Sequence, residues 1–194
     1  MNSASADRTT IARYRIDPPG SRFTVQAFAT GLLSVFAHSP TFSVRGLSGE
    51  VLLPGGNVEN LELELTVDPS SLQLEDRVSA ADRMEIEHRM RDEVLETSDH
   101  PQIVFRGAGS AATAIGPGQY RLFIQGSLDL HGVNHPHRSD VELFLFVDGL
   151  RLRGGDSLRM SDFGIRPVSA VGGTIKLKDE VRLSFDIGGL PAGP

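Results

Sequence analysis

The sequence contains no cysteine, and its charged side chains are more often acidic than basic. Without cysteine the chain can form no disulfide and offers no thiolate to a metal ion. The formal net charge at pH 7 is −6, from 19 lysine and arginine residues against 25 aspartate and glutamate residues. Duplex nucleic acid and anionic membrane surfaces bind clustered positive charge, so we expect neither as a partner.

Long apolar runs are also missing. The most apolar candidate, Ala27 to Ala37, is too short to span a bilayer and contains a glycine and two hydroxyl side chains. We therefore expect no stable membrane insertion. The start, MNSASADRTTIARY, lacks the apolar stretch of a secretory signal, so we expect the protein in the cytoplasm.

The length of 194 residues suits one domain with a large core. The polar N-terminal segment shows no pattern typical of a helix or a strand. We expect disorder over residues 1–10 and a single domain over residues 11–190.

Alternation of apolar and polar residues dominates this domain. From Tyr120 to Val147, apolar side chains recur at every second position on both sides of a short polar turn, which predicts a hairpin. Turn signals rich in glycine and proline separate the other alternating segments. The pattern predicts an all-β fold, an eight-stranded antiparallel barrel. We expect its strands near residues 12–28, 41–53, 60–67, 101–107, 119–130, 138–148, 150–160 and 174–187.

The positions of these strands that are expected to face outward are only partly polar. Phe123, Phe144 and Phe146 interleave there with polar residues. The outer face must therefore be covered in part or contact an apolar surface. A homodimer is left open.

One segment breaks the strand pattern. Residues 79–97 contain neither glycine nor proline and are rich in helix formers, and Ser79 with Asp82 resembles a capping box, so we expect one interposed α-helix. Ile86, Met90 and Val94 form one stripe, and Met84 and Leu95 are expected on the opposite side. The stripe either packs on the barrel or closes its mouth as a lid.

The residues at the positions expected to face inward are aliphatic and aromatic. A barrel of eight strands is either filled by side chains or holds one small ligand, and the sequence leaves both alternatives open. If there is a cavity, its ligand-binding residues are expected to be Phe23, Val25, Phe36, His38, Phe42, Leu63, Leu65, Ile86, Met90, Val94, Phe105, Leu122, Ile124, Leu143, Leu145, Phe163, Leu183 and Phe185.

Two catalytic alternatives carry less weight. His131, His135 and His137 could offer imidazoles to a metal ion, but the last two flank a proline in an expected exposed turn with no acidic ligand fixed nearby. Ser161, His38 and Asp162 lack the surrounding nucleophile-elbow motif of a hydrolase. We expect no catalytic residue and no metal.

Five segments, in order, resemble the signatures of the YceI-like polyisoprenoid-binding proteins. They are RYRID at 13–17, SRFTV at 21–25, RDEVLETSDHPQIVF at 91–105, GSLDLHGVNHP at 126–136 and SDFGI at 161–165, the last followed by KDEVRLSFDI. The resemblance covers nearly the whole domain. It implies a lipocalin-like barrel with an interposed helix and an apolar channel for a polyprenyl chain or another long-chain amphiphile. It implies no reaction.

The departures from the family pattern fall at polar positions. Gly20, Val94 and Met160 stand where the family usually has a histidine, a histidine and an arginine. If those groups hold a ligand head, this protein should prefer a less charged one.

The expected function is therefore non-catalytic binding or carriage of a long-chain isoprenoid lipid or a lipid-tailed quinone. The expected partner is a hydrophobic small molecule, and no cofactor is expected. The alternative is an enzyme that acts on a lipid, with a metal held by His131, His135 and His137.

Overall fold

The computed structural model describes residues 11–30, 39–166, 169–170 and 175–193. The segment 1–10, for which we expected disorder, and the candidate residues Phe36 and His38 lie outside these ranges.

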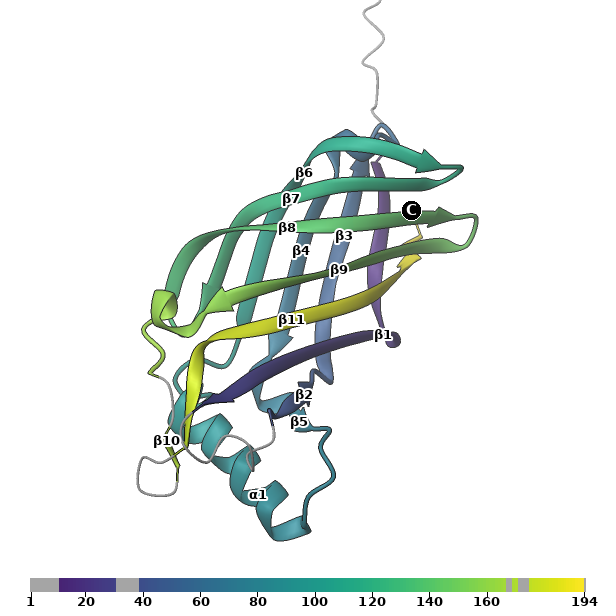
Figure 1. Cartoon of the computed structure of the whole chain (residues 1–194). Coiled ribbons are helices and arrows are strands. Elements are labelled where there is room, and N and C mark those ends of the chain that lie inside the picture. The colour runs from purple at the N-terminus through teal and green to yellow at the C-terminus, as the bar shows by residue number, and fades with distance from the viewer. Residues whose placement is uncertain (1–10, 31–38, 167–168, 171–174, 194) are drawn as a thin grey trace, which may run out of the picture.

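The described chain folds as a closed antiparallel barrel with one α-helix at one end (Figure 1). In spatial order the long strands run β1–β3–β4–β6–β7–β8–β9–β11, and pairing of β11 with β1 closes the ring. The prediction of an eight-stranded antiparallel barrel is thus confirmed. The bounds of the long strands are β1 Ile11–Thr30, β3 Gly46–Pro54, β4 Glu62–Asp68, β6 Ile103–Gly116, β7 Gln119–Leu130, β8 Val133–Phe146, β9 Gly149–Arg159 and β11 Ile175–Pro191.

Three short strands extend the sheet at the end that carries the helix. They are β2 Thr41–Ser43, β5 Gln73–Leu74 and β10 Ser169–Ala170. One strand was predicted over 41–53, but the chain here forms β2 and β3 separately. β1 pairs with β3 through residues 11–15 and with β2 through residues 24–26, and the interruption between β2 and β3 accommodates both pairings.

Alternation places the inward side chains as the sequence predicted. Along β4, Leu63, Leu65 and Val67 are buried, whereas Glu62, Glu64 and Asp68 are exposed. Each strand pair keeps inward residues opposite one another, as with Leu65 and Phe105 across β4 and β6. The barrel interior is therefore built almost entirely from this one parity.

The helix begins where the capping signal predicts. In α1, Ala80–Arg89, the Ser79 hydroxyl accepts a hydrogen bond from the Asp82 backbone N–H at 3.1 Å. A π-helical turn, Met90–Val94, continues it, and the Leu95 N–H donates to the Met90 carbonyl at 3.0 Å. This wider turn carries Leu95 to the barrel side, which corrects the prediction that Leu95 lies opposite the stripe. None of the helices in the described part of the chain is long and apolar enough to cross a membrane.

Arginine side chains cover part of the apolar outer face. The Arg138 guanidinium carbon lies 3.6 Å from the centroid of the Phe123 ring, and that of Arg153 lies 5.2 Å from the Phe144 ring. These contacts shield the outward-facing aromatic rings from solvent, while the charges of the two arginines stay hydrated. Phe146, at the tip of the β8–β9 hairpin, is still 55% exposed.

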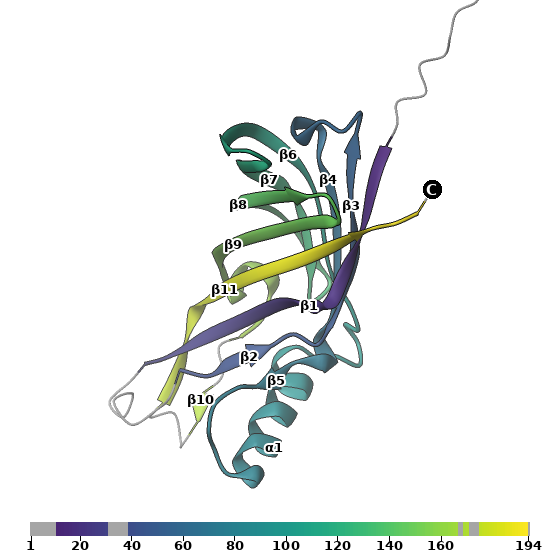
Figure 2. The same ribbon diagram turned by 90° about the vertical axis from the view of Figure 1, so that its right-hand side faces the viewer.

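The end of the barrel that lies away from α1 in Figure 2 is filled by side chains of the main hydrophobic cluster, and we call it the solid end. Val51, Leu122 and Leu143 are at most 1% exposed there, and Leu145 packs against them. Both alternatives for the interior therefore hold in part, because one end of the barrel is filled and the other is not.

Candidate functional site

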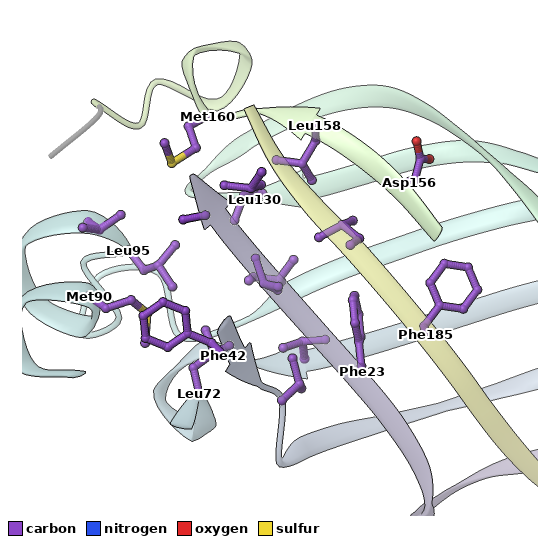
Figure 3. Close-up of a pocket in the computed structure, with 18 of the residues that line it drawn as sticks. Phe23, Phe42, Leu72, Met90, Leu95, Leu130, Asp156, Leu158, Met160 and Phe185 are labelled. Carbon is purple, nitrogen blue, oxygen red and sulfur yellow. The ribbon is translucent and has the colours of Figure 1, made fainter. Parts of the chain in front are cut away.

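An apolar cavity of about 940 Å³ occupies the barrel between this solid end and α1 (Figure 3). Its wall is formed by inward side chains of the strands together with α1 and the turn that follows it. The volume lies at the upper end of the range of cavities that bind small ligands.

Twelve of the eighteen candidate ligand-binding residues line this cavity. They are Phe23, Val25, Phe42, Leu63, Leu65, Ile86, Met90, Val94, Phe105, Ile124, Leu183 and Phe185. The helical stripe of Ile86, Met90 and Val94 thus faces the cavity.

Four other candidates are placed elsewhere, and the assignment is corrected for them. Leu122, Leu143 and Leu145 belong to the solid end of the barrel, where facing side chains leave no space. Phe163 is 2% exposed and packs in a separate cluster with Met160 and Ile165. The inward parity of Leu122, Leu143 and Leu145 was right, but their level along the barrel axis puts them outside the cavity, whereas Phe163 lies in the helical turn Met160–Phe163 and not in a strand.

The structure also adds wall residues that were not among the candidates. Leu128, Leu130, Val141 and Val181 show the alternation that could have identified them. A second group has no periodic signal, because its residues lie in connecting segments or in the two-residue strand β5. It comprises Pro40, Leu72, Leu74 and Val78.

Charged side chains of α1 line part of the cavity. Asp82 and Glu85 are exposed to solvent and also line the cavity, so the cavity reaches the surface there. Arg89 lines it too, with its Nε 2.6 Å from Glu85 Oε1. The hydrogen bond from Arg89 to Glu85 raises the pKa of the guanidinium, which stays charged and paired.

Polar groups also occur deep inside the apolar wall. We call His137, Ser139 and Asp156 the polar subsite; all three line the cavity. His137 Nε2 lies 3.0 Å from Asp156 Oδ2 without the alignment of a hydrogen bond. Among the described residues, neither the Ser139 hydroxyl nor Asp156 Oδ2 has a hydrogen-bond partner, although both atoms are buried.

The three histidines of the metal alternative are not brought together. β8 begins at Val133, so only His131 and Gly132 form the turn, and His135 and His137 lie in the strand. This corrects the expectation that His135 and His137 lie in an exposed turn. His135 bonds the Pro136 carbonyl and stacks edge-on against Phe163, whereas His137 lies beside Asp156.

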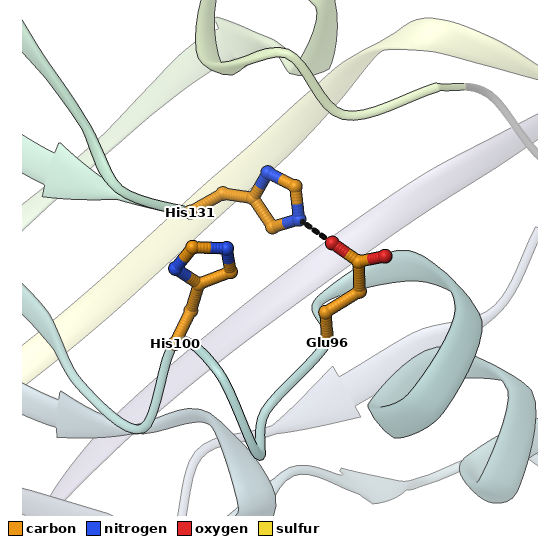
Figure 4. Close-up of side chains that lie close together, drawn as sticks. All are labelled: Glu96, His100 and His131. Carbon is orange, nitrogen blue, oxygen red and sulfur yellow. Dashed lines mark hydrogen bonds and ion pairs between the residues drawn. The ribbon is translucent and has the colours of Figure 1, made fainter.

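His131 instead lies close to Glu96 and His100. Its Nε2 lies 2.8 Å from Glu96 Oε2, and its ring centroid lies 4.3 Å from that of His100, with the two planes tilted at 50° (Figure 4). Ligand atoms of these three side chains lie within 4.8 Å of one another, as a metal site would need, and no other group of three or more does so in the described part of the chain. The hydrogen bond between His131 and Glu96 already satisfies one pair of these atoms.

The serine of the hydrolase alternative is also engaged elsewhere. The Ser161 hydroxyl donates to Asp179 at 2.6 Å, and the Ser161 N–H donates to the same carboxylate at 2.8 Å. The third member, His38, lies outside the described residues.

Solved structures with this fold include two with close overall agreement. Burkholderia cenocepacia BcnA is 16% identical, with a TM-score of 0.65 over 89% of this chain and 98% of its own. A polyisoprenoid binding domain from Saccharophagus degradans, implicated in plant cell wall breakdown, is 15% identical, with a TM-score of 0.67 over 94% of this chain and 100% of its own. A Campylobacter jejuni YceI protein is 14% identical, with a TM-score of 0.55 over 79% of this chain and 85% of its own.

A comparison with curated proteins gave no match. The family description "YceI-like domain" matches residues 14–188, which run from the first long strand to the last. This match agrees with the order of motifs in the sequence and with the barrel they form. The chain belongs to the YceI-like domain family.

Proposed function

We propose that this protein binds and carries a long-chain isoprenoid lipid or a lipid-tailed quinone. The apolar cavity of about 940 Å³ is the observation that carries the proposal. The relative from Saccharophagus degradans is described as a polyisoprenoid binding domain, and the shared family supports the same class of ligand here.

Burial of the chain supplies the affinity. Transfer of one five-carbon prenyl unit from water contributes about 4 kcal/mol at ~0.8 kcal/mol per carbon, before ordering costs. Micromolar affinity corresponds to about 8 kcal/mol, so two or three buried units are enough. The length of chain that fits the cavity should therefore dominate selection among lipids.

The role is binding without catalysis. The described part of the cavity wall presents aliphatic and aromatic side chains, and its few polar groups do not form a nucleophile with an aligned base. The geometry does not support the metal-dependent alternative, because His131 lies beside Glu96 and His137 lies beside Asp156, at separate places. A cytoplasmic location and a homodimer stay predictions.

Identification of the natural ligand tests the proposal directly. Protein purified from cells without detergent is extracted with organic solvent, and the extract is analysed by mass spectrometry. We expect a long-chain isoprenoid at a stoichiometry near one per chain, absent from the extract of a variant with a charge in the cavity. An empty protein that also fails to bind farnesol, phytol or ubiquinone would contradict the proposal.

A further inference from the structure

We propose that the polar subsite recognises a single hydroxyl group of the ligand bound in the cavity. This inference rests on the proposed function and adds the chemistry of the head group. Ser139 is the clearest sign: it is 8% exposed, lies on β8 opposite Ile124 and lines the cavity, and its hydroxyl has no partner among the described residues. A buried hydroxyl without a partner is costly, so a partner from the cavity is expected.

Asp156 supplies a matching acceptor from the next strand, β9. Its Oδ1 accepts a hydrogen bond from the Ser157 N–H at 2.7 Å, which holds the side chain in place. Its Oδ2 is buried and free of hydrogen bonds in the described structure. Because a hydroxyl both donates and accepts, one such group can donate to the Asp156 carboxylate while accepting from Ser139.

His137 is held in place beside this carboxylate. Its ring meets Phe105 edge to face, with centroids 6.0 Å apart and planes at 90°. On the neighbouring strand its register partner is Gly126, which has no side chain to compete for the same inward space. The imidazole therefore lies where it can support Asp156 without filling the cavity.

The subsite lies partway along the cavity, because Leu152, four residues before Asp156 on β9, also lines the wall farther from α1. Asp156 is four residues before Met160, which lies at the α1 end, so about 13 Å of strand separates them at ~3.3 Å per residue. Figure 3 shows Asp156 on the same side as Phe185, away from Met90 and Leu95. A ligand whose hydroxyl reaches Asp156 therefore has apolar wall for its chain both toward α1 and toward Leu152.

The charges of the wall select against a phosphate head. Besides Asp156, the described wall contains the carboxylates of Asp76, Asp82 and Glu85, whereas its arginine, Arg89, is paired with Glu85. A phosphate or diphosphate placed beside Asp156 would meet like charge in an apolar interior without a free cation. An alcohol or the phenol of a reduced quinone carries the required donor without this repulsion.

Ligands with the same chain and different head groups separate the contribution of the head group to affinity from that of the chain. Phytol, its hydrocarbon phytane and phytyl diphosphate, each delivered from cyclodextrin, are titrated against a fluorescent apolar probe bound to the wild-type protein. We expect phytol to bind about tenfold more tightly than phytane, a difference of about 1.4 kcal/mol, and phytyl diphosphate to bind more weakly than phytol.

Variants assign this preference to the subsite. Ser139→Ala and Asp156→Leu should abolish the preference, so that each variant binds phytol and phytane with equal affinity. Asp140→Ala, which removes an exposed carboxylate next to Ser139 on the same strand, is the control and should keep the tenfold preference. If Asp156→Leu fails to fold, Ser139→Ala alone decides the question.

The outcomes distinguish the two proposals. Equal affinity of the wild-type protein for phytol and phytane, or an unchanged preference in Ser139→Ala, would overturn the hydroxyl subsite and leave lipid binding intact. Tighter binding of the diphosphate would also overturn it. Failure of all three ligands to bind would overturn the proposed function itself.

Discussion

Phe23 and Phe185 meet edge to face across the strand pair that closes the barrel, with ring centroids 6.1 Å apart and planes at 71°. They are register partners on β1 and β11, and both line the cavity. Phe185 extends over Gly154, where an added Cβ would lie 2.6 Å from the ring. The lack of a side chain at Gly154 thus allows the aromatic pair to shape the inner end of the cavity.

Truncation of Phe185 should lengthen the cavity. In Phe185→Ala we expect a loss of about 2 kcal/mol in the free energy of unfolding, below the usual 3–5 kcal/mol because the ring already faces open space. We also expect longer isoprenoid alcohols to gain affinity relative to shorter ones. Urea unfolding and a series of alcohols of increasing length measure the two effects. Phe146→Ala, at an exposed hairpin tip, should change neither, and an unaltered length preference in Phe185→Ala would count against the inner end described here.

A charge in the cavity wall should abolish lipid binding. Leu65→Arg places an unpaired cation in the apolar wall, so co-purified lipid should disappear from the folded protein. Glu62→Arg on the same strand changes the charge more but faces solvent, and it should leave binding intact. Ligand content per folded chain, measured by mass spectrometry, checks both, and equal loss in both variants would contradict an internal site.

Leu145→Arg separates stability from binding. Leu145 packs in the solid end and its N–H bonds the Gly118 carbonyl, so a charge there should destabilise the barrel by roughly 3 kcal/mol without entering the cavity. The fraction that folds should still bind lipid. Loss of binding in well-folded Leu145→Arg would show that the two ends of the interior are not independent.

Acid should weaken the turn after β9 through Asp179. Hydrogen bonds from the Ser161 hydroxyl and N–H hold the pKa of Asp179 below its ordinary value of 3.8. Because the folded-state pKa is lowered, the stabilisation is complete above 3.8 and is lost as the pH falls through the folded-state pKa. Urea unfolding at a series of acidic pH values should show a smaller acid-dependent loss in Ser161→Ala than in the wild type. Ser157→Ala is the control, and identical acid dependence in Ser161→Ala would rule out this linkage.

Removal of metal ions should not change the stability of the protein. His131 already bonds Glu96, so we expect the melting temperature to be the same with and without a strong chelator. His131→Ala should cost about 1 kcal/mol through loss of this hydrogen bond. A chelator that lowers the melting temperature of the wild type but not of His131→Ala would instead identify Glu96, His100 and His131 as a metal site.

The sequence by itself determined the local features. A strand alternates with a period of two, so the order of residues alone assigns Leu63 and Glu62 to opposite faces of β4. Ser79 marked the start of the helix, because its hydroxyl caps a backbone N–H only three residues away. Both properties depend on near neighbours in the chain.

Only the tertiary structure decided where the barrel is empty. Ile124 and Val141 line the cavity, whereas Leu122 and Leu143, two residues away with the same parity, lie in the solid end. Parity fixes the face of a strand, but the level of a side chain along the barrel axis depends on the register of every neighbouring strand. The same register brings His137, Ser139 and Asp156 from two strands to one place in the wall, a proximity that neither strand contains in its own sequence.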